Sequence, residues 1–64
     1  MSSPSPAIAA AHEDLVAAHR VEDAAREAFS RDASDEHLQA FIAAVTARRL
    51  AEETFECAAG RRAP

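Results

Sequence analysis

The sequence has few of the features that usually stabilise a chain as short as 64 residues. Cys57 is the only cysteine, so an intrachain disulfide is excluded, and no Cys/His cluster has zinc-finger spacing. A chain of this length forms at most one domain and buries only about 60% of the surface that its unfolded form exposes. Oligomerisation is the remaining common source of stability. We therefore expect self-association.

Lysine, tryptophan and tyrosine are absent. Seven arginines against eleven acidic residues give a net charge of −4, so the chain lacks the basic excess that is typical of phosphate binding. There is also no tyrosine or tryptophan on which a base could stack, no glycine-rich phosphate loop, and no nucleophile with a neighbouring base. These absences argue against an enzyme and against nucleic acid as the partner.

Long apolar runs are absent as well. Charged residues interrupt every segment that approaches the roughly 20 apolar residues of a membrane-spanning helix. The first residues contain no basic stretch followed by an apolar run, which a secretory signal would require. A single thiol fits a reducing compartment. We expect a cytoplasmic location and no membrane partner.

Helix breakers are confined to the ends of the chain. Glycine occurs once, prolines occur at positions 4, 6 and 64, and 18 residues are alanine, so the interior favours helix. Ser5 followed by Pro6 is typical of a helix start. Ser34, followed by two acidic residues, predicts a second start, and Gly60 predicts a left-handed C-cap.

These signals predict an all-α fold, an antiparallel two-helix hairpin. Two helices joined by so short a turn are antiparallel neighbours. The expected organisation is a disordered N-terminal tail over 1–5, one hairpin domain over 6–60 and a C-terminal tail over 61–64. Within the hairpin we expect helices over about 6–31 and 35–59 and a turn over 32–34.

A seven-residue repeat predicts which residues face inward. In the first helix, large side chains recur at position a and alanines recur at position d of the heptad. In the second helix the phenylalanines fall at d, where they could lie over the alanine column of the first, large against small. The residues expected in the core or in an interface are Ile8, Leu15, Ala18, Ala25, Phe29, Leu38, Phe41, Ile42, Val45 and Phe55.

Ile42 and Leu50 fall outside the inward stripe, so the second helix is apolar over more than one face. A helix of this kind belongs inside a bundle, which predicts that two hairpins pair into a dimeric four-helix bundle. The alternative is that Leu50 is a scattered exposed residue. In length and hairpin layout the chain resembles the plasmid repressor-of-primer family, dimeric four-helix bundles that bind paired RNA loops. The resemblance implies an assembly but carries no shared motif.

Three charged residues, Glu22, Arg48 and Glu52, interrupt the inward stripe. Antiparallel pairing across the turn would bring Glu22 near Arg48 and His19 near Glu52. The first interpretation is an ion-pair layer that fixes the register of the helices. The second is a metal site of His19, Glu22 and Glu52, doubled by two-fold symmetry as in di-iron carboxylate bundles. The third is a solvated layer without a special role.

The metal interpretation has two difficulties. The His-x-x-Glu order from His19 to Glu22 reverses the Glu-x-x-His motif of those bundles, and Arg48 competes for the carboxylates. We therefore expect no cofactor.

The first functional hypothesis is a small non-enzymatic interaction protein. It would be a homodimeric adaptor or regulator, or an accessory subunit, that binds an unidentified protein through its helix faces. A metal-binding bundle and a repressor-of-primer-like RNA-binding regulator are the alternatives.

Overall fold

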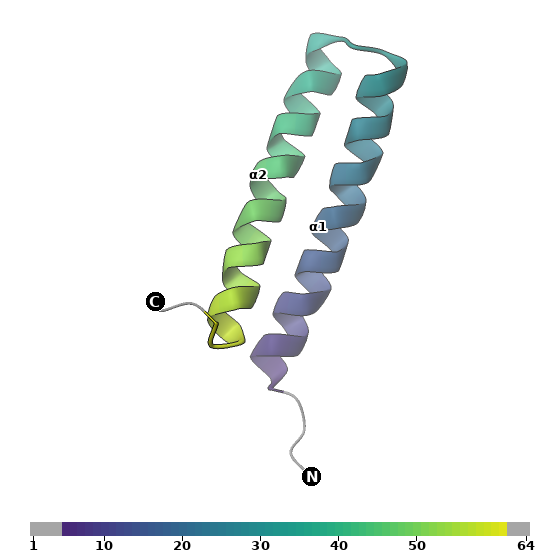
Figure 1. Ribbon diagram of the computed structural model, residues 1–64. Helices are drawn as coiled ribbons and strands as arrows, with labels where there is room; N and C mark the ends of the chain where they lie inside the picture. The colour runs from purple at the N-terminus through teal and green to yellow at the C-terminus, as the bar shows by residue number, and fades with distance from the viewer. Residues whose placement is uncertain (1–4, 62–64) are drawn as a thin grey trace.

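The protein consists of two long helices that run antiparallel, side by side (Figure 1). The computed structural model describes residues 5–61, in which α1 spans Pro6–Arg31 and α2 spans Asp35–Ala58. The predicted all-helical hairpin is confirmed. The tails expected at the two ends lie outside the described residues, apart from Ser5 and Arg61.

Local hydrogen bonds begin each helix. The Ser5 hydroxyl accepts a hydrogen bond from the backbone N–H of Ala7 at 3.3 Å, and the hydroxyl of Ser34 accepts one from the backbone N–H of His37 at 3.2 Å. Each serine thus satisfies a donor that the first helical turn leaves unpaired. Between the helices Asp32 is extended, with φ −148° and ψ 101°. That conformation ends α1.

The end of α2 depends on the single glycine. Gly60 has a φ of 72°, a left-handed conformation that costs a residue with a Cβ atom about 1–2 kcal/mol. This conformation allows the N–H of Arg61 to donate to the Glu56 carbonyl at 2.9 Å. It also allows the N–H of Gly60 to donate to the Cys57 carbonyl at 3.1 Å. This is the Schellman arrangement. It ends α2 at Ala58, one residue before the expected position.

The two helices bury little between them. Within the described residues, Ala11 and Ala44 are the only buried hydrophobic residues, Glu22 is the only buried charged one, and no large side chain is fully buried. Several of the expected core residues are only half-buried, namely Ile8, Leu15, Ala18, Ala25, Phe29, Phe41, Val45 and Phe55. The hairpin therefore has no closed core. It has a seam, the strip along which α1 and α2 contact each other.

The face of α2 that meets α1 differs from the heptad assignment. Ala44 is 4% exposed, whereas Leu38 and Ile42, both expected in the core or in an interface, are 37% and 51% exposed. An alanine lets two helix backbones approach closely. The α2 helix is therefore turned so that Ala44 faces α1 and the larger Leu38 lies at the flank.

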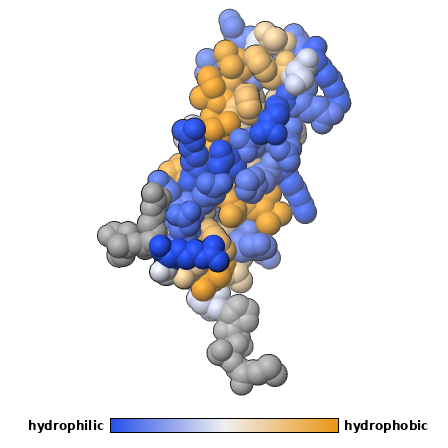
Figure 2. Space-filling model, in the orientation of Figure 1, coloured by the Kyte–Doolittle hydropathy of each residue, from blue (hydrophilic) through white to orange (hydrophobic). Residues whose placement is uncertain are grey.

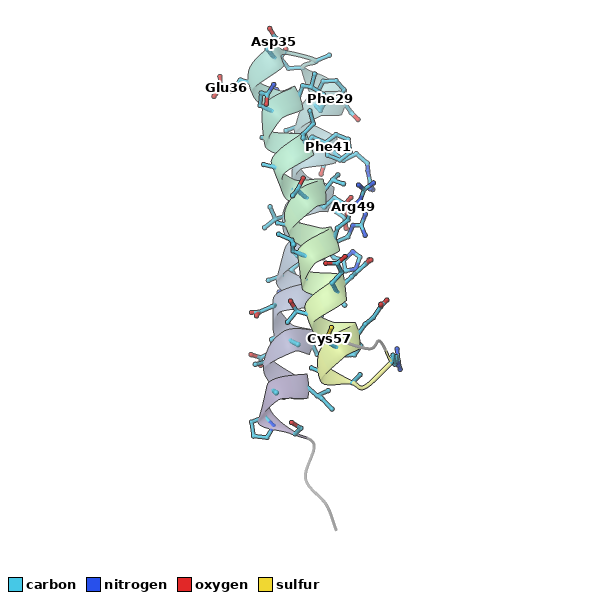
Figure 3. The ribbon with its side chains drawn as sticks, turned by 90° about the vertical axis from the view of Figure 1, so that its left-hand side faces the viewer. Phe29, Asp35, Glu36, Phe41, Arg49 and Cys57 are labelled. Carbon is cyan, nitrogen blue, oxygen red and sulfur yellow. The ribbon has the colours of Figure 1, made fainter. Side chains whose placement is uncertain are left out.

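Aromatic rings close the seam near both of its ends. Phe29 and Phe41 stack near the turn with ring centroids 6.3 Å apart and an interplanar angle of 24°. Both are labelled near the turn end in Figure 3. Towards the termini, His12 and Phe55 lie 5.9 Å apart. The two phenylalanines of α2 thus have ring partners on α1.

The outer surface is unevenly apolar. On the side drawn in Figure 2, hydrophobic residues gather towards the turn end and hydrophilic ones fill much of the middle. Within residues 5–61, neither helix combines the length and the apolar character that crossing a membrane would require.

Candidate functional site

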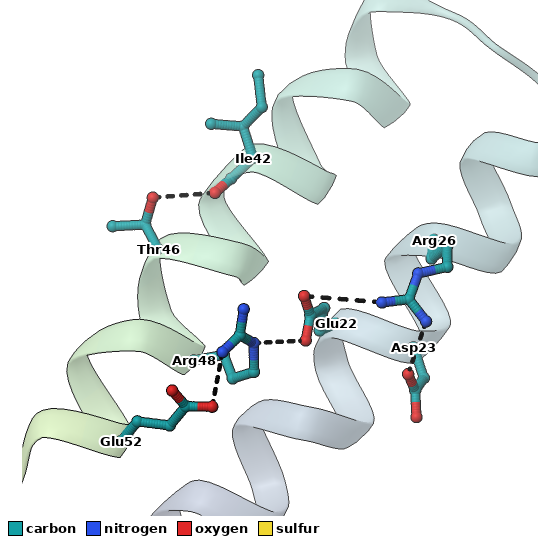
Figure 4. A network of polar contacts seen from close by, with 7 residues as sticks. All are labelled: Glu22, Asp23, Arg26, Ile42, Thr46, Arg48 and Glu52. Atoms are coloured by element: carbon teal, nitrogen blue, oxygen red, sulfur yellow. Dashed lines mark hydrogen bonds and ion pairs between the residues drawn. The ribbon is translucent and has the colours of Figure 1, made fainter.

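A charged layer crosses the seam near the middle of the hairpin (Figure 4). Its centre is Glu22 of α1, whose side chain is 8% exposed, and the Nε atom of Arg48 on α2 lies 2.8 Å from its Oε1 atom. The heptad repeat turns both residues inward, and the antiparallel pairing sets them at the same level. The structure thus brings together the two residues that the register predicts to meet.

Arg48 joins two carboxylates. Its Nη1 atom donates to Oε1 of Glu52, one turn further along α2, at 2.6 Å. The hydrogen bond to Glu52 and the charges of Glu22 and Glu52 raise the pKa of Arg48 above its ordinary value, and burial opposes this rise. The guanidinium therefore carries its positive charge between the two carboxylates.

A second arginine completes the layer on the solvent side. The Nη2 atom of Arg26 lies 3.8 Å from Oε2 of Glu22, and its Nη1 atom donates to Oδ1 of Asp23 at 3.3 Å. The side chains of Arg26 and Asp23 are 57% and 71% exposed, so water and salt screen their interactions. Asp23 was not among the predicted site residues, although its i,i+3 spacing to Arg26 is a signal for such a contact.

The buried polar atoms of the layer all have hydrogen-bond partners. Within residues 5–61, no buried side-chain nitrogen or oxygen lacks a hydrogen-bond partner. A buried ion pair of this kind need not add net stability, because desolvation offsets the Coulomb attraction, but it disfavours any register that separates the two charges. The layer therefore favours the register of α1 against α2 in which Glu22 meets Arg48.

The described part of the hairpin contains no preformed metal site. Among the described residues, no group of three or more His, Cys, Asp or Glu side chains is arranged to hold an ion. His19 is exposed. No hydrogen bond or ion pair within residues 5–61 joins it to Glu52, which instead binds Arg48. The guanidinium occupies the place that a metal cation would need.

Two other features bring polar or reactive side chains to the surface. A depression is lined by His12, Glu13, Val16, Ala17 and Arg20, but all five belong to α1, so it is a hollow on one helix rather than a cleft between two. Cys57 is exposed and lies in the last turn of α2, where the helix dipole does not favour a thiolate. Neither feature pairs a nucleophile with a base.

Comparison with known proteins identifies no relative. No protein-family model matches the chain, and no curated protein or solved structure matches it significantly. The functional interpretation therefore depends on the residues of the hairpin itself.

Proposed function

We propose that this protein is a non-enzymatic helical interaction protein whose hairpins pair into a dimeric four-helix bundle. The bundle acts as an adaptor, a regulator or an accessory subunit and binds a partner protein through its helix faces.

One observation carries the proposal: the hairpin leaves its own apolar side chains unburied. Val21, Ile42 and Leu50 are each more than half exposed, and the only buried hydrophobic residues among those described are two alanines. Two helices also offer too little apolar contact to offset the conformational entropy that is lost when each residue is ordered. A second layer of helices would supply the missing contact, as it does in other small helical proteins.

The charged layer supports the same function. By fixing the register of α1 against α2, the pair Glu22 and Arg48 holds the outer faces of the hairpin in one relative position. A surface for protein recognition benefits from such preorganisation, because less conformational freedom is lost on binding.

Sedimentation equilibrium of the full chain at micromolar concentration tests the assembly. This method reports mass independently of shape, which matters for a molecule that extends 49 × 23 × 12 Å. We expect twice the chain mass of 6.8 kDa, together with a melting temperature that rises with protein concentration. A folded monomer whose melting temperature is independent of concentration would overturn the proposal.

A pull-down from the native cell tests the adaptor role. The bait is the tagged chain, and the control is a tagged chain carrying Ile42→Glu and Leu38→Glu, which removes the exposed apolar pair near the turn. We expect a protein that is retained by the first bait at stoichiometric amounts. Recovery of structured RNA in its place, with salt-dependent binding, would contradict the proposed class of partner.

A further inference from the structure

The two broad faces of the hairpin differ sharply in charge. One residue corresponds to about 100° of helix rotation. Glu22 of α1 and Arg48 of α2 face each other. Because the two helices are antiparallel, the residue before each of them lies on the same side of the hairpin. These two residues are Val21 and Ala47, whereas the residues after Glu22 and Arg48 are Asp23 and Arg49. Arg49 extends from one edge of the hairpin in Figure 3.

The face around Val21 and Ala47 contains no charged residue over about three helical turns. Continuing at the helical spacing of three and four residues gives eight residues, which we call the alanine face: Ala17, Val21, Ala24, Ala28, Ala40, Ala43, Ala47 and Leu50. All are exposed except Ala28, which is half-buried. Asp14, Arg31 and Glu36 are the next charged residues on this side, Asp14 towards the termini and the other two towards the turn.

The opposite face, around Asp23 and Arg49, holds the ion pairs. Arg26 contacts Glu22 and Asp23 there, and Glu52 contacts Arg48. A helix layer packed on that side would have to desolvate these charges. The alanine face can be covered without that penalty.

Large apolar side chains on the alanine face are a separate indication that something covers it. Val21 is 57% exposed and Leu50 is 59% exposed, the two highest values among the large hydrophobic residues described. Glu22 contacts Arg48 and Phe29 stacks on Phe41, so Val21 and Leu50 lie within about one residue, or 1.5 Å, of the same level. They form one ridge across a flat surface of alanines.

We propose that a second copy of this chain docks on the alanine face, with the ridge of Val21 and Leu50 packed against the alanines of the other copy. The inference rests on the proposed dimer and names its interface. Electrostatic complementarity commonly selects one partner protein over another, and this face offers no charged or hydrogen-bonding group for it. In a two-fold dimer the same patch meets itself, and large against small interdigitates.

The dimensions suit this occupant. A standard interface buries about 800 Å² on each partner. The alanine face is about three helical turns, or about 16 Å, long, so the contact extends beyond it along the broad face of the hairpin, which measures 49 by 23 Å. Alanine also lets helix axes approach closely. Two hairpins stacked in this way form two layers of helices and leave both charged layers in contact with water.

Paired substitutions on opposite faces test the assignment by sedimentation equilibrium. Val21→Glu places a charge on the alanine face, Ile42→Glu removes a similarly exposed apolar side chain elsewhere, and Gln39→Glu controls for added charge. We expect Val21→Glu to weaken the dimer by at least ~100-fold because each carboxylate would be desolvated without a partner. The other two variants should change it less than ~10-fold.

The outcomes separate this inference from the proposed function. A dimeric wild type that survives Val21→Glu, or that is lost equally with Ile42→Glu, overturns the alanine face but leaves dimerisation standing. A monomeric wild type overturns both. Coupled folding predicts that Val21→Glu loses helicity together with association. In that case the comparison with Ile42→Glu still shows whether the alanine face is the interface.

Isotope-filtered NMR on the unmutated protein gives an independent answer. In a mixture of ¹³C-labelled and unlabelled chains, we expect intermolecular contacts from the methyl groups of Val21 and Leu50 to alanine methyls. Intermolecular contacts confined to Leu38 and Ile42 would overturn the inference.

Discussion

Replacing Arg48 with methionine tests the charged layer most directly. The substitution keeps the length and much of the apolar stem of the side chain but removes the cation that contacts Glu22 at 2.8 Å and Glu52 at 2.6 Å. Glu52 is 40% exposed and can be hydrated. Glu22 is 8% exposed and retains only the contact with Arg26 at 3.8 Å. The cost therefore falls mainly on Glu22.

The magnitude follows from that burial. A buried carboxylate that loses its partner destabilises a fold by about 3–5 kcal/mol. Because Arg26 remains as a partial substitute, we expect the free energy of unfolding to fall by about 2–4 kcal/mol. With an m-value near 1 kcal/mol/M, the urea midpoint should fall by about 2 M or more.

The assay is urea unfolding followed by circular dichroism at 222 nm, at one fixed protein concentration. Arg49→Met is the matched control, since Arg49 is the adjacent arginine and is exposed; its effect should stay within about 0.5 kcal/mol. The double variant Glu22→Leu/Arg48→Met should recover most of the loss, because no charge is then left buried. Equal effects of Arg48→Met and Arg49→Met would refute the argument. So would stoichiometric binding of Zn²⁺ or Fe²⁺ by the wild type that Glu22→Ala abolishes.

Two further predictions concern single residues of α2 and its cap. Phe41→Ala should lower the free energy of unfolding by about 2–3 kcal/mol and Leu50→Ala by about 1–2 kcal/mol. The reason is that Phe41 stacks on Phe29, whereas Leu50 is 59% exposed in the hairpin. Equal shifts of the urea midpoint would mean that the inward face of α2 is misassigned. Gly60→Ala should cost about 1–2 kcal/mol through its positive φ alone, because no atom lies within 4 Å of the added Cβ. Gly60→Asn should cost less, since asparagine tolerates this conformation, and thermal melts in which the two variants are equally stable would exclude this cause.

Local signals were sufficient to predict the helices. Ser5 and Ser34 can cap a helix through their own hydroxyl groups, and Gly60 can adopt a left-handed conformation without strain. These properties belong to residues within one or two turns of each helix end, so they can be identified without knowledge of distant contacts. The same holds for the antiparallel pairing, which the short connection at Asp32–Ser34 imposes.

The rotation of α2 could not be predicted in the same way. The second helix is apolar over a wide arc, and the heptad repeat predicted that Leu38 would face inward. In the structure Leu38 is 37% exposed and Ala44 is buried. Several rotations of such a helix bury similar apolar area, and close approach at the alanines selects one of them. The exposure of Leu38 follows from that choice.

The sequence by itself determined two helices, their ends, their antiparallel order and the presence of opposite charges near the middle. Each of these depends on covalent neighbours or on residue numbers counted from the turn. Only the tertiary structure decided that Glu22 is the buried member of the charged layer, that Arg48 joins Glu22 to Glu52, and that an uncharged face remains uncovered. Burial depends on the distance and rotation of the facing helix, and these arise from packing along the whole seam rather than from any local pattern.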